Sequence, residues 1–146
     1  MSHAVAPISE IENPFLNYLG IVSGEMKHGR AEIYLDLHHQ HMNSWEITHG
    51  GVTMTMLDVA MAMAGRSLFD DQKGVVTIEM KTTFLQAGGV IGSRLVAHAK
   101  VFHQTATMCF CEADVWNGDK LVAKGMGTYQ FLRSLKAKAG LLRMGV

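Results

Sequence analysis

The chain has 146 residues, of which 48% are hydrophobic and 18% are charged. This length predicts one domain, residues 1–146, and the excess of apolar over charged residues excludes a disordered chain. Thirteen basic residues balance thirteen acidic ones. A net charge of zero argues against bulk electrostatic binding to nucleic acid or to an anionic membrane.

The first twelve residues lack the basic start and apolar run of a signal peptide, so 1–12 is interpreted as an N-terminal extension. The most apolar stretch begins at Gly50 and is shorter than the roughly 18 residues that a membrane span needs. Cys109 and Cys111 stand two apart in a predicted strand. A disulfide there would be strained, and a zinc site has no second cysteine pair. We therefore expect a soluble, cytoplasmic protein with two buried thiols.

The first half of the chain predicts one short helix and two strands. Asn13 as N-cap, Pro14 at the first helical position and Gly20 after the last turn delimit the helix. The second strand alternates apolar and polar residues strictly, which is typical of a half-buried strand. The predicted elements are a helix over 14–19, strands over 21–26 and 30–37, and a loop over 38–48.

The longest predicted helix begins at Gly50 and consists of about 15–20 good helix formers. Because it is apolar on nearly every face, it is predicted to be buried on all sides. Gly125 and Gly127 share one face of the last strand, where a bulky group is expected to approach closely. Four strands follow the helix, over 75–85, 92–102, 105–116 and 120–132. The first of them places Val76, Ile78, Met80 and Phe84 on one face. A tight turn at 103–104 precedes the third.

This order of elements predicts an α+β fold in which one antiparallel sheet curls around one helix. Such a fold leaves one side of the sheet and one end of the helix uncovered, so we expect dimerisation. Residues 133–146 contain four basic residues and no acidic one, and they are interpreted as a basic C-terminal tail.

Asp58 is the residue that the apolar helix does not explain. Its neighbours three and four positions away are Met54, Thr55, Met61 and Ala62, so no cation within one turn pairs with it. An unpaired buried carboxylate is costly. One interpretation is a hydrogen bond to a partner subunit's backbone at the helix edge. The other is a catalytic base or nucleophile in a dry cleft, and the start of the helix favours it.

His49, Gly50 and Gly51 open the same helix. Glycines admit a ligand close to the backbone, and the first-turn amides carry the positive end of the helix dipole. A carbonyl oxygen that gains negative charge would be stabilised there, as in an oxyanion hole. From Gly50 to Asp58 is about 12 Å of helix, too far for both to contact one carbonyl. If both are catalytic, they belong to different chains, and two antiparallel helices form two composite sites.

Three stretches together resemble a known family, the hotdog-fold acyl-CoA thioesterases, and in particular their phenylacetate-degradation branch. The similarity extends from about Pro14 to Leu132 and implies a hotdog fold of five to six strands around a central helix. It also implies hydrolysis of acyl-CoA thioesters by a homodimer or a homotetramer. The stretches are His49-Gly50-Gly51 followed by Asp58, Val76-Thr77-Ile78-Glu79-Met80-Lys81 with Phe84-Leu85, and Leu121-Val122-Ala123-Lys124-Gly125 with Gly127-Thr128-Tyr129.

The resemblance implies roles for individual residues. The Gly50 amide would polarise the thioester carbonyl, and Asp58 of the facing subunit would act as general base or nucleophile. Asn43 would position the nucleophile or the substrate, His49 would shape the oxyanion turn, and Thr77 would assist the water. Coenzyme A enters as part of the substrate, so no cofactor and no metal are expected. The residues expected to contact substrate are Gly51, Met54 and Met61.

Two other functions stay open. The first is a non-catalytic acyl-CoA sensor on the same fold, against which Asp58 argues, because a sensor has no need for a buried base. The second is a hotdog enoyl-CoA hydratase. Such enzymes use a histidine paired with an acid, in a motif to which His49 does not belong. The sequence specifies neither the acyl group nor the contacts to the CoA phosphates. The histidines His38, His39 and His41 lack an acidic partner at ligand spacing and are assigned to a surface loop.

Overall fold

A computed structural model describes residues 13–70 and 73–132 of the chain. The predicted N-terminal extension and basic tail lie outside the described residues. Within those residues, no helix combines the length and hydropathy needed to cross a membrane. The elements are α1 (Pro14–Leu19), β1 (Val22–Lys27), β2 (Arg30–Asp36), the 3₁₀ helix η2 (His39–His41), α2 (Gly50–Arg66), β3 (Val75–Phe84), β4 (Arg94–Gln104), β5 (Met108–Asn117) and β6 (Lys120–Phe131).

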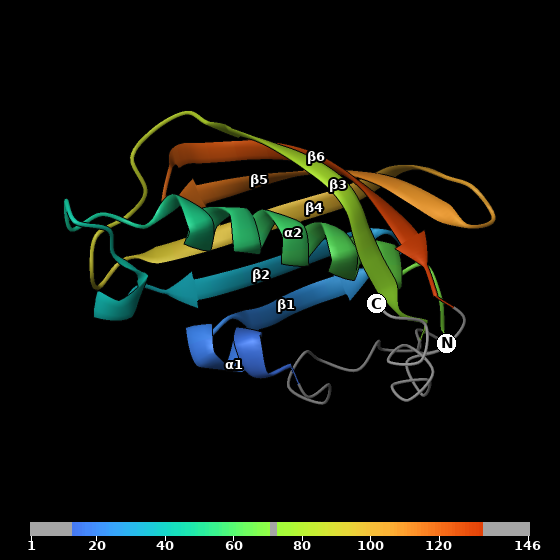
Figure 1. Ribbon diagram of the computed structural model, residues 1–146, viewed down its shortest axis with the longest axis horizontal. Helices are drawn as coiled ribbons and strands as arrows, with labels where there is room; N and C mark the ends of the chain where they lie inside the picture. Colours follow the sequence, from blue (N-terminus) through green and yellow to red (C-terminus); the bar gives the residue numbers. More distant parts are fainter. Residues whose placement is uncertain (1–12, 71–72, 133–146) are drawn as a thin grey trace.

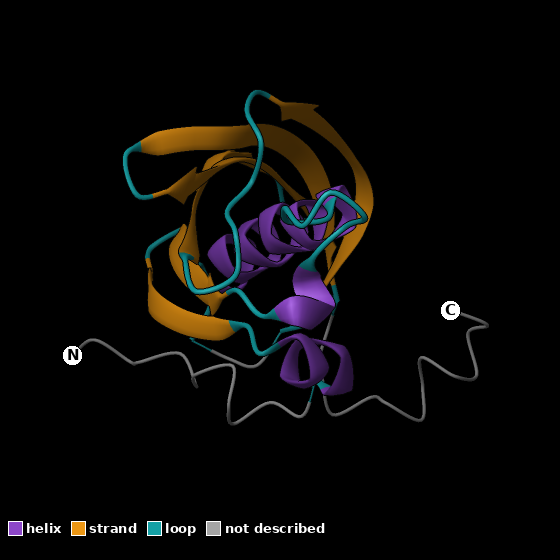
Figure 2. Cartoon of the chain, turned by 90° about the vertical axis from the view of Figure 1, so that its left-hand side faces the viewer, coloured by secondary structure: helices purple, strands orange, loops and turns teal. Residues whose placement is uncertain are grey.

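One six-stranded antiparallel sheet wraps around α2, as Figures 1 and 2 show. The strand order is β1-β2-β4-β5-β6-β3, so β1 and β3 form the two edges. The predicted α+β class and the hotdog architecture are confirmed. The sheet covers α2 on one side only, and the opposite side of the helix faces the viewer in Figure 1.

The signals at the first helix are confirmed in detail. Asn13 Oδ1 accepts a hydrogen bond from the Leu16 N–H at 3.3 Å, and Pro14 occupies the first turn. Gly20 ends α1 with a φ of 84°, a left-handed conformation that favours glycine. The helix buries Leu16 and Leu19, so it packs against the rest of the fold.

The core lies between α2 and the concave face of the sheet. Alternate residues of β2, β4 and β5 point into it, and α2 contributes Leu57 and Met61, which have no exposed surface. A Cβ added to Gly125 on β6 would lie 3.3 Å from Leu57 Cδ1, so the predicted close approach occurs there. Cys109 and Cys111 are free and fully buried, with their Sγ atoms 3.8 Å apart.

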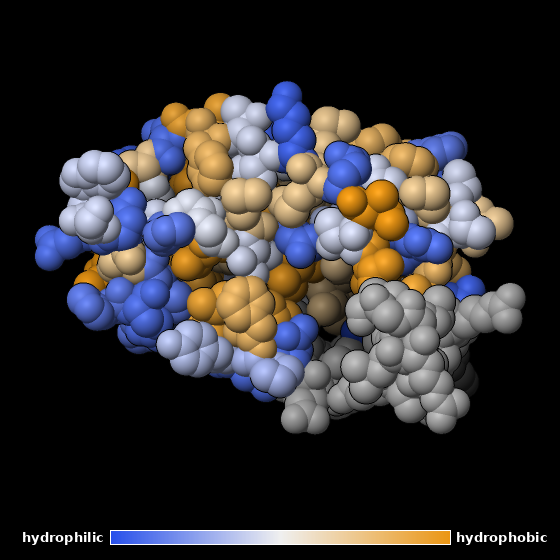
Figure 3. Space-filling model, in the orientation of Figure 1, coloured by the Kyte–Doolittle hydropathy of each residue, from blue (hydrophilic) through white to orange (hydrophobic). Residues whose placement is uncertain are grey.

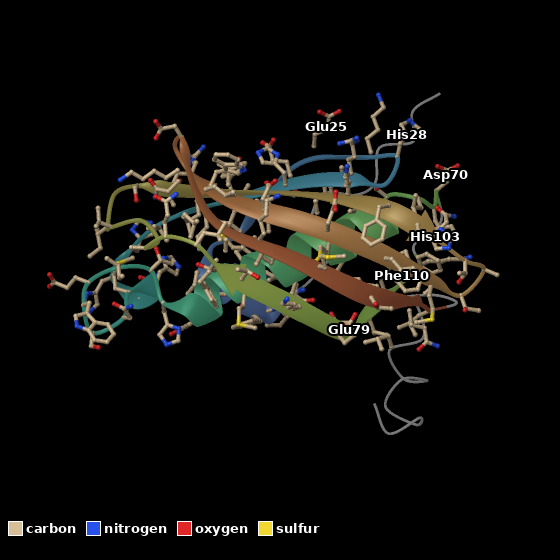
Figure 4. The ribbon with its side chains drawn as sticks, turned by 90° about the horizontal axis from the view of Figure 1, so that it is seen from above. Glu25, His28, Asp70, Glu79, His103 and Phe110 are labelled. Atoms are coloured by element: carbon tan, nitrogen blue, oxygen red, sulfur yellow. The ribbon has the colours of Figure 1, made fainter. Side chains whose placement is uncertain are left out.

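A bulge in β3 reverses the expected alternation. Thr77 pairs with Tyr129 but Glu79 pairs with Thr128, so one extra residue lies between them. Thr77 faces α2, whereas Glu79 faces outward, where Thr128 Oγ1 donates a hydrogen bond to it at 2.6 Å (Figure 4). The prediction of one common face was therefore wrong for the set Val76, Ile78, Met80 and Phe84.

The turn between β4 and β5 also lies later than predicted. Residues 103–104 belong to β4, which ends at Gln104, and β5 begins only at Met108. The reason is the side chain of Thr105, whose Oγ1 accepts hydrogen bonds from the N–H groups of Thr107 at 3.3 Å and Met108 at 3.1 Å. A hydroxyl that bonds to the backbone two and three residues on fixes a tight turn.

The single chain does not bury α2 on all sides, contrary to the prediction. One face of the helix stays at least partly open to the surface, and we call it the open stripe. Its residues recur at intervals of three and four, as one helical face requires. The sheet covers the opposite face, and nothing among the described residues covers this one completely. The open stripe consists of Gly51, Met54, Thr55, Asp58 and Ala62.

Candidate active site

Asp58 lies midway along the open stripe, and two hydroxyl groups hold its carboxylate. Thr77 Oγ1 donates a hydrogen bond to Oδ1 at 2.6 Å, and the Tyr129 hydroxyl donates to the same oxygen at 3.0 Å. The Tyr129 hydroxyl also lies 3.2 Å from the Asp58 backbone oxygen. Within the described residues, no group hydrogen-bonds to Oδ2. Oδ2 is therefore the carboxylate oxygen left for an incoming molecule.

Tyr129 on β6 is a residue that sequence reasoning missed. Its side chain is completely buried and lies across Gly127, where an added Cβ would be 2.8 Å from the ring Cε2. Burial, and after it the negative charge of Asp58, raises the pKa of the Tyr129 phenol. The phenol stays protonated and acts as a donor. The available signal was the glycine two residues earlier on the same strand face, which leaves space for a ring.

The start of α2 presents one free backbone donor. His49 is the N-cap, and its Nδ1 accepts a hydrogen bond from the Gly51 N–H at 2.9 Å. Because Nδ1 accepts, the proton of a neutral imidazole is on Nε2. The Gly50 N–H has no partner within the part of the chain that the structure describes. Phe84 flanks this amide, since a Cβ on Gly50 would lie 3.3 Å from its ring.

Asn43 organises the loop that leads to α2. Its Oδ1 accepts hydrogen bonds from the N–H groups of Trp45 at 2.9 Å and Ile47 at 3.3 Å. This arrangement holds Glu46 at a φ of 60° and leaves the Trp45 side chain 81% exposed. The Asn43 amide nitrogen has no hydrogen bond to any described residue, so it remains available as a donor.

His41 is buried, which corrects its assignment to a surface loop. The His38 N–H donates to its Nδ1 at 2.9 Å, so Nε2 carries the proton and donates to the Leu19 oxygen at 2.7 Å. Its backbone oxygen accepts from the His49 N–H at 2.8 Å. His41 thus ties α1 to the start of α2. The structure holds no cluster of potential metal ligands within the described residues.

The structure brings the predicted site residues together in two groups. Asp58 and Thr77 lie together near the middle of α2, and Asn43, His49, Gly50 and Gly51 lie at its start. Eight residues, or about 12 Å of helix, separate Gly50 from Asp58. One chain therefore does not present both groups to the same small substrate atom.

The two predicted methionine contacts differ. Met54 lies on the open stripe, between the two groups, and is 39% exposed. Met61 has no exposed surface and belongs to the core, which corrects its expected place beside a substrate. Its backbone oxygen accepts a hydrogen bond from Cys111 Sγ at 3.6 Å, so this turn of α2 packs against β5.

A surface depression on the sheet is not the site. It holds about 440 Å³ and lies on the outer face of the sheet, away from α2. Its lining alternates in charge, with an ion pair of 3.1 Å between Lys100 and Glu112. The arrangement at Asp58 and at the start of α2 remains the only one described above that combines a carboxylate with a free amide donor.

Comparison with known proteins identifies the family. The model of the thioesterase superfamily matches residues 46–124, more than half of the chain. The chain belongs to the thioesterase superfamily. The matched segment includes the start of α2, Asp58, Thr77 and most of the sheet.

Curated relatives align with the chain at moderate identity. A candidate esterase of Schizosaccharomyces pombe is 34% identical over 109 residues, which are 73% of this chain and 65% of that protein. Acyl-coenzyme A thioesterase 13 of Mus musculus is 32% identical over 93 residues, 61% of this chain and 64% of that protein. The chain thus spans just under two thirds of the length of these relatives.

Solved structures agree on fold and branch. A conserved Pseudomonas aeruginosa protein superposes with a TM-score of 0.78 at 30% identity, covering 85% of this chain and 98% of that one. The Escherichia coli PaaI protein from the phenylacetic acid degradation operon superposes with a TM-score of 0.79 at 25% identity, covering 87% and 90%. These matches confirm the hotdog fold of this superfamily member and its resemblance to the phenylacetate-degradation branch.

Proposed function

We propose that this thioesterase-superfamily protein hydrolyses acyl-CoA thioesters at a site shared by two copies of the chain. The observation that carries the proposal is the Asp58 carboxylate on the open stripe, held through Oδ1 by Thr77 and Tyr129 with Oδ2 left free. The relatives named as acyl-coenzyme A thioesterases support the substrate class.

The residues at the start of α2 and those around Asp58 have different roles in the reaction. Gly50 supplies a backbone N–H that stabilises negative charge as it develops on the thioester oxygen, and His49 holds that turn. Asp58 Oδ2 receives a proton from water while the water oxygen attacks the carbonyl carbon. The carbon–sulfur bond then breaks, and the proton on Asp58 passes to the CoA sulfur. The sequence also left open a direct attack by Oδ2, followed by hydrolysis of the resulting anhydride.

A single turnover in ¹⁸O-water with excess enzyme identifies attack by Asp58 if label appears in the enzyme. Direct attack by water places the label in the released acid, and so does attack by Asp58 followed by hydrolysis at the acyl carbon. Attack by Asp58, followed by hydrolysis at its own carboxyl carbon, places the label in Asp58, where mass spectrometry of the peptide detects it. Both outcomes retain Asp58 as the reacting group.

A second copy brings the two groups together. If two α2 helices lie antiparallel with Asp58 of one facing Gly50 of the other, Met54 lies halfway between them and faces its own counterpart. β3 is an unpaired edge of ten residues, and Ile78 and Phe84 on it are each 51% exposed. Large apolar side chains on an open edge are typical of a surface that pairs with another chain. We therefore propose a homodimer, alone or within a homotetramer.

Thr77 takes a different role from the one that the resemblance implied. Its hydroxyl donates to Asp58 at 2.6 Å, so we propose that it orients the carboxylate and does not bind the water itself. Asn43 keeps its implied role through its free amide nitrogen, which is available to the substrate or water in the facing chain's site.

The test of the function is thiol release from a panel of short, medium, long and aryl acyl-CoA esters. We expect turnover of at least one class. Binding of CoA esters without thiol release from any of them would instead favour the sensor, and hydration of an enoyl-CoA would favour the hydratase. Either result would overturn the hydrolase.

Replacing Tyr129 by Phe tests the hydrogen bond on Asp58. The variant keeps the ring over Gly127 but loses one donor to the carboxylate, and a hydrogen bond to a charged group is worth about 1.5–3 kcal/mol. Because Thr77 remains, we expect a fall in kcat of about tenfold.

The matched control is Tyr34→Phe. Tyr34 lies on the outer face of the sheet, where the Arg94 guanidinium carbon lies 4.5 Å from the centroid of its ring. This change is expected to leave kcat at its wild-type value. A wild-type kcat in Tyr129→Phe would show that the phenol does not position Asp58.

A further inference from the structure

Arg66 is a buried cation that the proposed mechanism does not use. It is the last residue of α2 and only 7% exposed. Its Nε atom is buried and has no hydrogen-bond partner among the described residues. None of the ion pairs among residues 13–70 and 73–132 includes Arg66; the basic members of those pairs are Arg94, His98 and Lys100.

This burial needs an explanation. Loss of hydration lowers the pKa of the Arg66 guanidinium, but an arginine keeps its charge in a protein. Buried charges are therefore normally paired. The negative end of the α2 dipole lies beside Arg66 and favours a cation, but it does not form the planar pair of hydrogen bonds that a guanidinium can make.

The position of Arg66 relates it to the candidate site. Arg66 follows Asp58 by eight residues, so it lies about 12 Å further along α2 and about 80° around the helix axis. It comes one turn after Ala62, the last residue of the open stripe, and therefore flanks that stripe. Figure 3 shows apolar side chains around a hollow on this face, below the C-terminal half of α2 as it is oriented in Figure 1.

We propose that Arg66 binds an anionic oxygen pair of the substrate, about 12 Å from the reacting carbonyl. Carboxylates and phosphates have the bidentate geometry that a guanidinium matches. In an acyl-CoA, such a group is either a carboxylate at the far end of the acyl chain or a phosphate of CoA. This proposal rests on the proposed function for the substrate class, but not on turnover.

Binding is measured by calorimetry in the Asp58→Asn background, where hydrolysis does not interfere. The probes are decanoyl-CoA, its ω-carboxylated analogue and decanoyl-pantetheine, which lacks the phosphates. Arg66→Met keeps an extended apolar side chain but removes the charge. Arg66→Lys keeps the charge but removes the planar guanidinium that can form two parallel hydrogen bonds. The matched control is Arg94→Met, which removes an arginine that is exposed and paired with Asp36 on the outer face.

We expect Arg66→Met to raise Kd at least about tenfold for the probes that carry the recognised anion, as loss of a charge-assisted pair predicts. A loss confined to the ω-carboxylated probe assigns Arg66 to the acyl end. A loss for both CoA esters, but not for decanoyl-pantetheine, assigns it to a phosphate. Arg66→Lys is expected to fall between Arg66→Met and the parent, and Arg94→Met to match the parent.

Equal Kd values for all three probes in Arg66→Met and its parent would overturn the proposal. A weaker dimer with unchanged Kd values would overturn it too, because Arg66 would then pair with an acidic group of the second copy. If Arg66→Met does not fold, two measurements replace it: the Kd values of Arg66→Lys, and the Kd values of the parent for the three probes. Equal binding of all three probes by the parent would contradict the proposal. Failure of thiol release in the wild type leaves these binding measurements intact, so the two proposals fail separately.

Discussion

Replacing Asp58 by Asn is expected to lower kcat/KM for acyl-CoA hydrolysis by about 10²–10⁴-fold, the usual contribution of a general base. The amide has nearly the same shape as the carboxylate. It retains one oxygen that can accept from Thr77 and Tyr129, so the melting temperature is expected to change little. The loss belongs to Oδ2, which becomes an amide nitrogen that neither takes a proton nor attacks a carbonyl.

The matched control for this change is Asp36→Asn. Asp36 is an exposed carboxylate that pairs with Arg94 at 2.7 Å on the outer face of the sheet, and such exposed pairs contribute little to stability. Thiol release by this variant is expected to match the wild type. Retention of wild-type activity in Asp58→Asn, measured beside this control, would exclude Asp58 from the reaction.

Replacing Gly50 by Pro is expected to lower kcat by about 10²–10³-fold, the cost of removing one oxyanion donor. Proline has no N–H, yet it is favoured at the first position of a helix. His49 before it has φ −62° and ψ 135°, an extended conformation that a residue preceding proline adopts readily. The variant therefore removes the donor while it preserves the start of α2.

Gly50→Ala separates the lost donor from the added side chain. It keeps the N–H and places the same Cβ about 3.3 Å from the Phe84 ring, which is half exposed and can shift. We expect a small loss of activity in Gly50→Ala and a large one in Gly50→Pro. Equal losses in the two variants would attribute the effect to the Phe84 contact and would exclude the amide as an oxyanion donor.

The candidate site was predictable where a residue contradicts its local pattern. A carboxylate without a cation in an apolar helix singled out Asp58, and the histidine and two glycines at the helix start marked the N-cap and the free amide. The two short-range signals at α1, Asn13 and Gly20, also gave its boundaries. Each of these inferences depends on neighbours within one or two turns of the chain.

The remaining features depend on contacts between distant segments. The bulge in β3 arises where Thr77 and Glu79 pair with consecutive residues of β6, and no local propensity requires it. Tyr129 reaches Asp58 from 71 positions away, and His41 is buried because it binds the Leu19 oxygen from 22 positions away. A buried histidine in a polar stretch has the sequence appearance of a surface loop.

The open stripe of α2 is a second feature that the sequence of the helix does not predict. The helix composition predicts burial on every face, and one chain covers all but the face that carries Met54 and Asp58. The excess apolar surface of α2 is consistent with a second chain, which we propose completes both its burial and its site. Sequence patterning alone does not distinguish a helix buried by its own chain from one buried by a partner.

The most direct measurement mixes two inactive chains. Asp58→Asn and Gly50→Pro chains are combined, allowed to exchange subunits, and assayed for thiol release, with exchange verified by native mass spectrometry. A mixed dimer holds one doubly damaged site and one intact site, so random exchange is expected to restore about a quarter of wild-type activity. Mixing Asp58→Asn with the Asp58→Asn, Gly50→Pro double variant creates no intact site and is expected to stay inactive. A fully exchanged mixture no more active than its parents would show that Asp58 and Gly50 do not act across two chains, and would contradict the composite site.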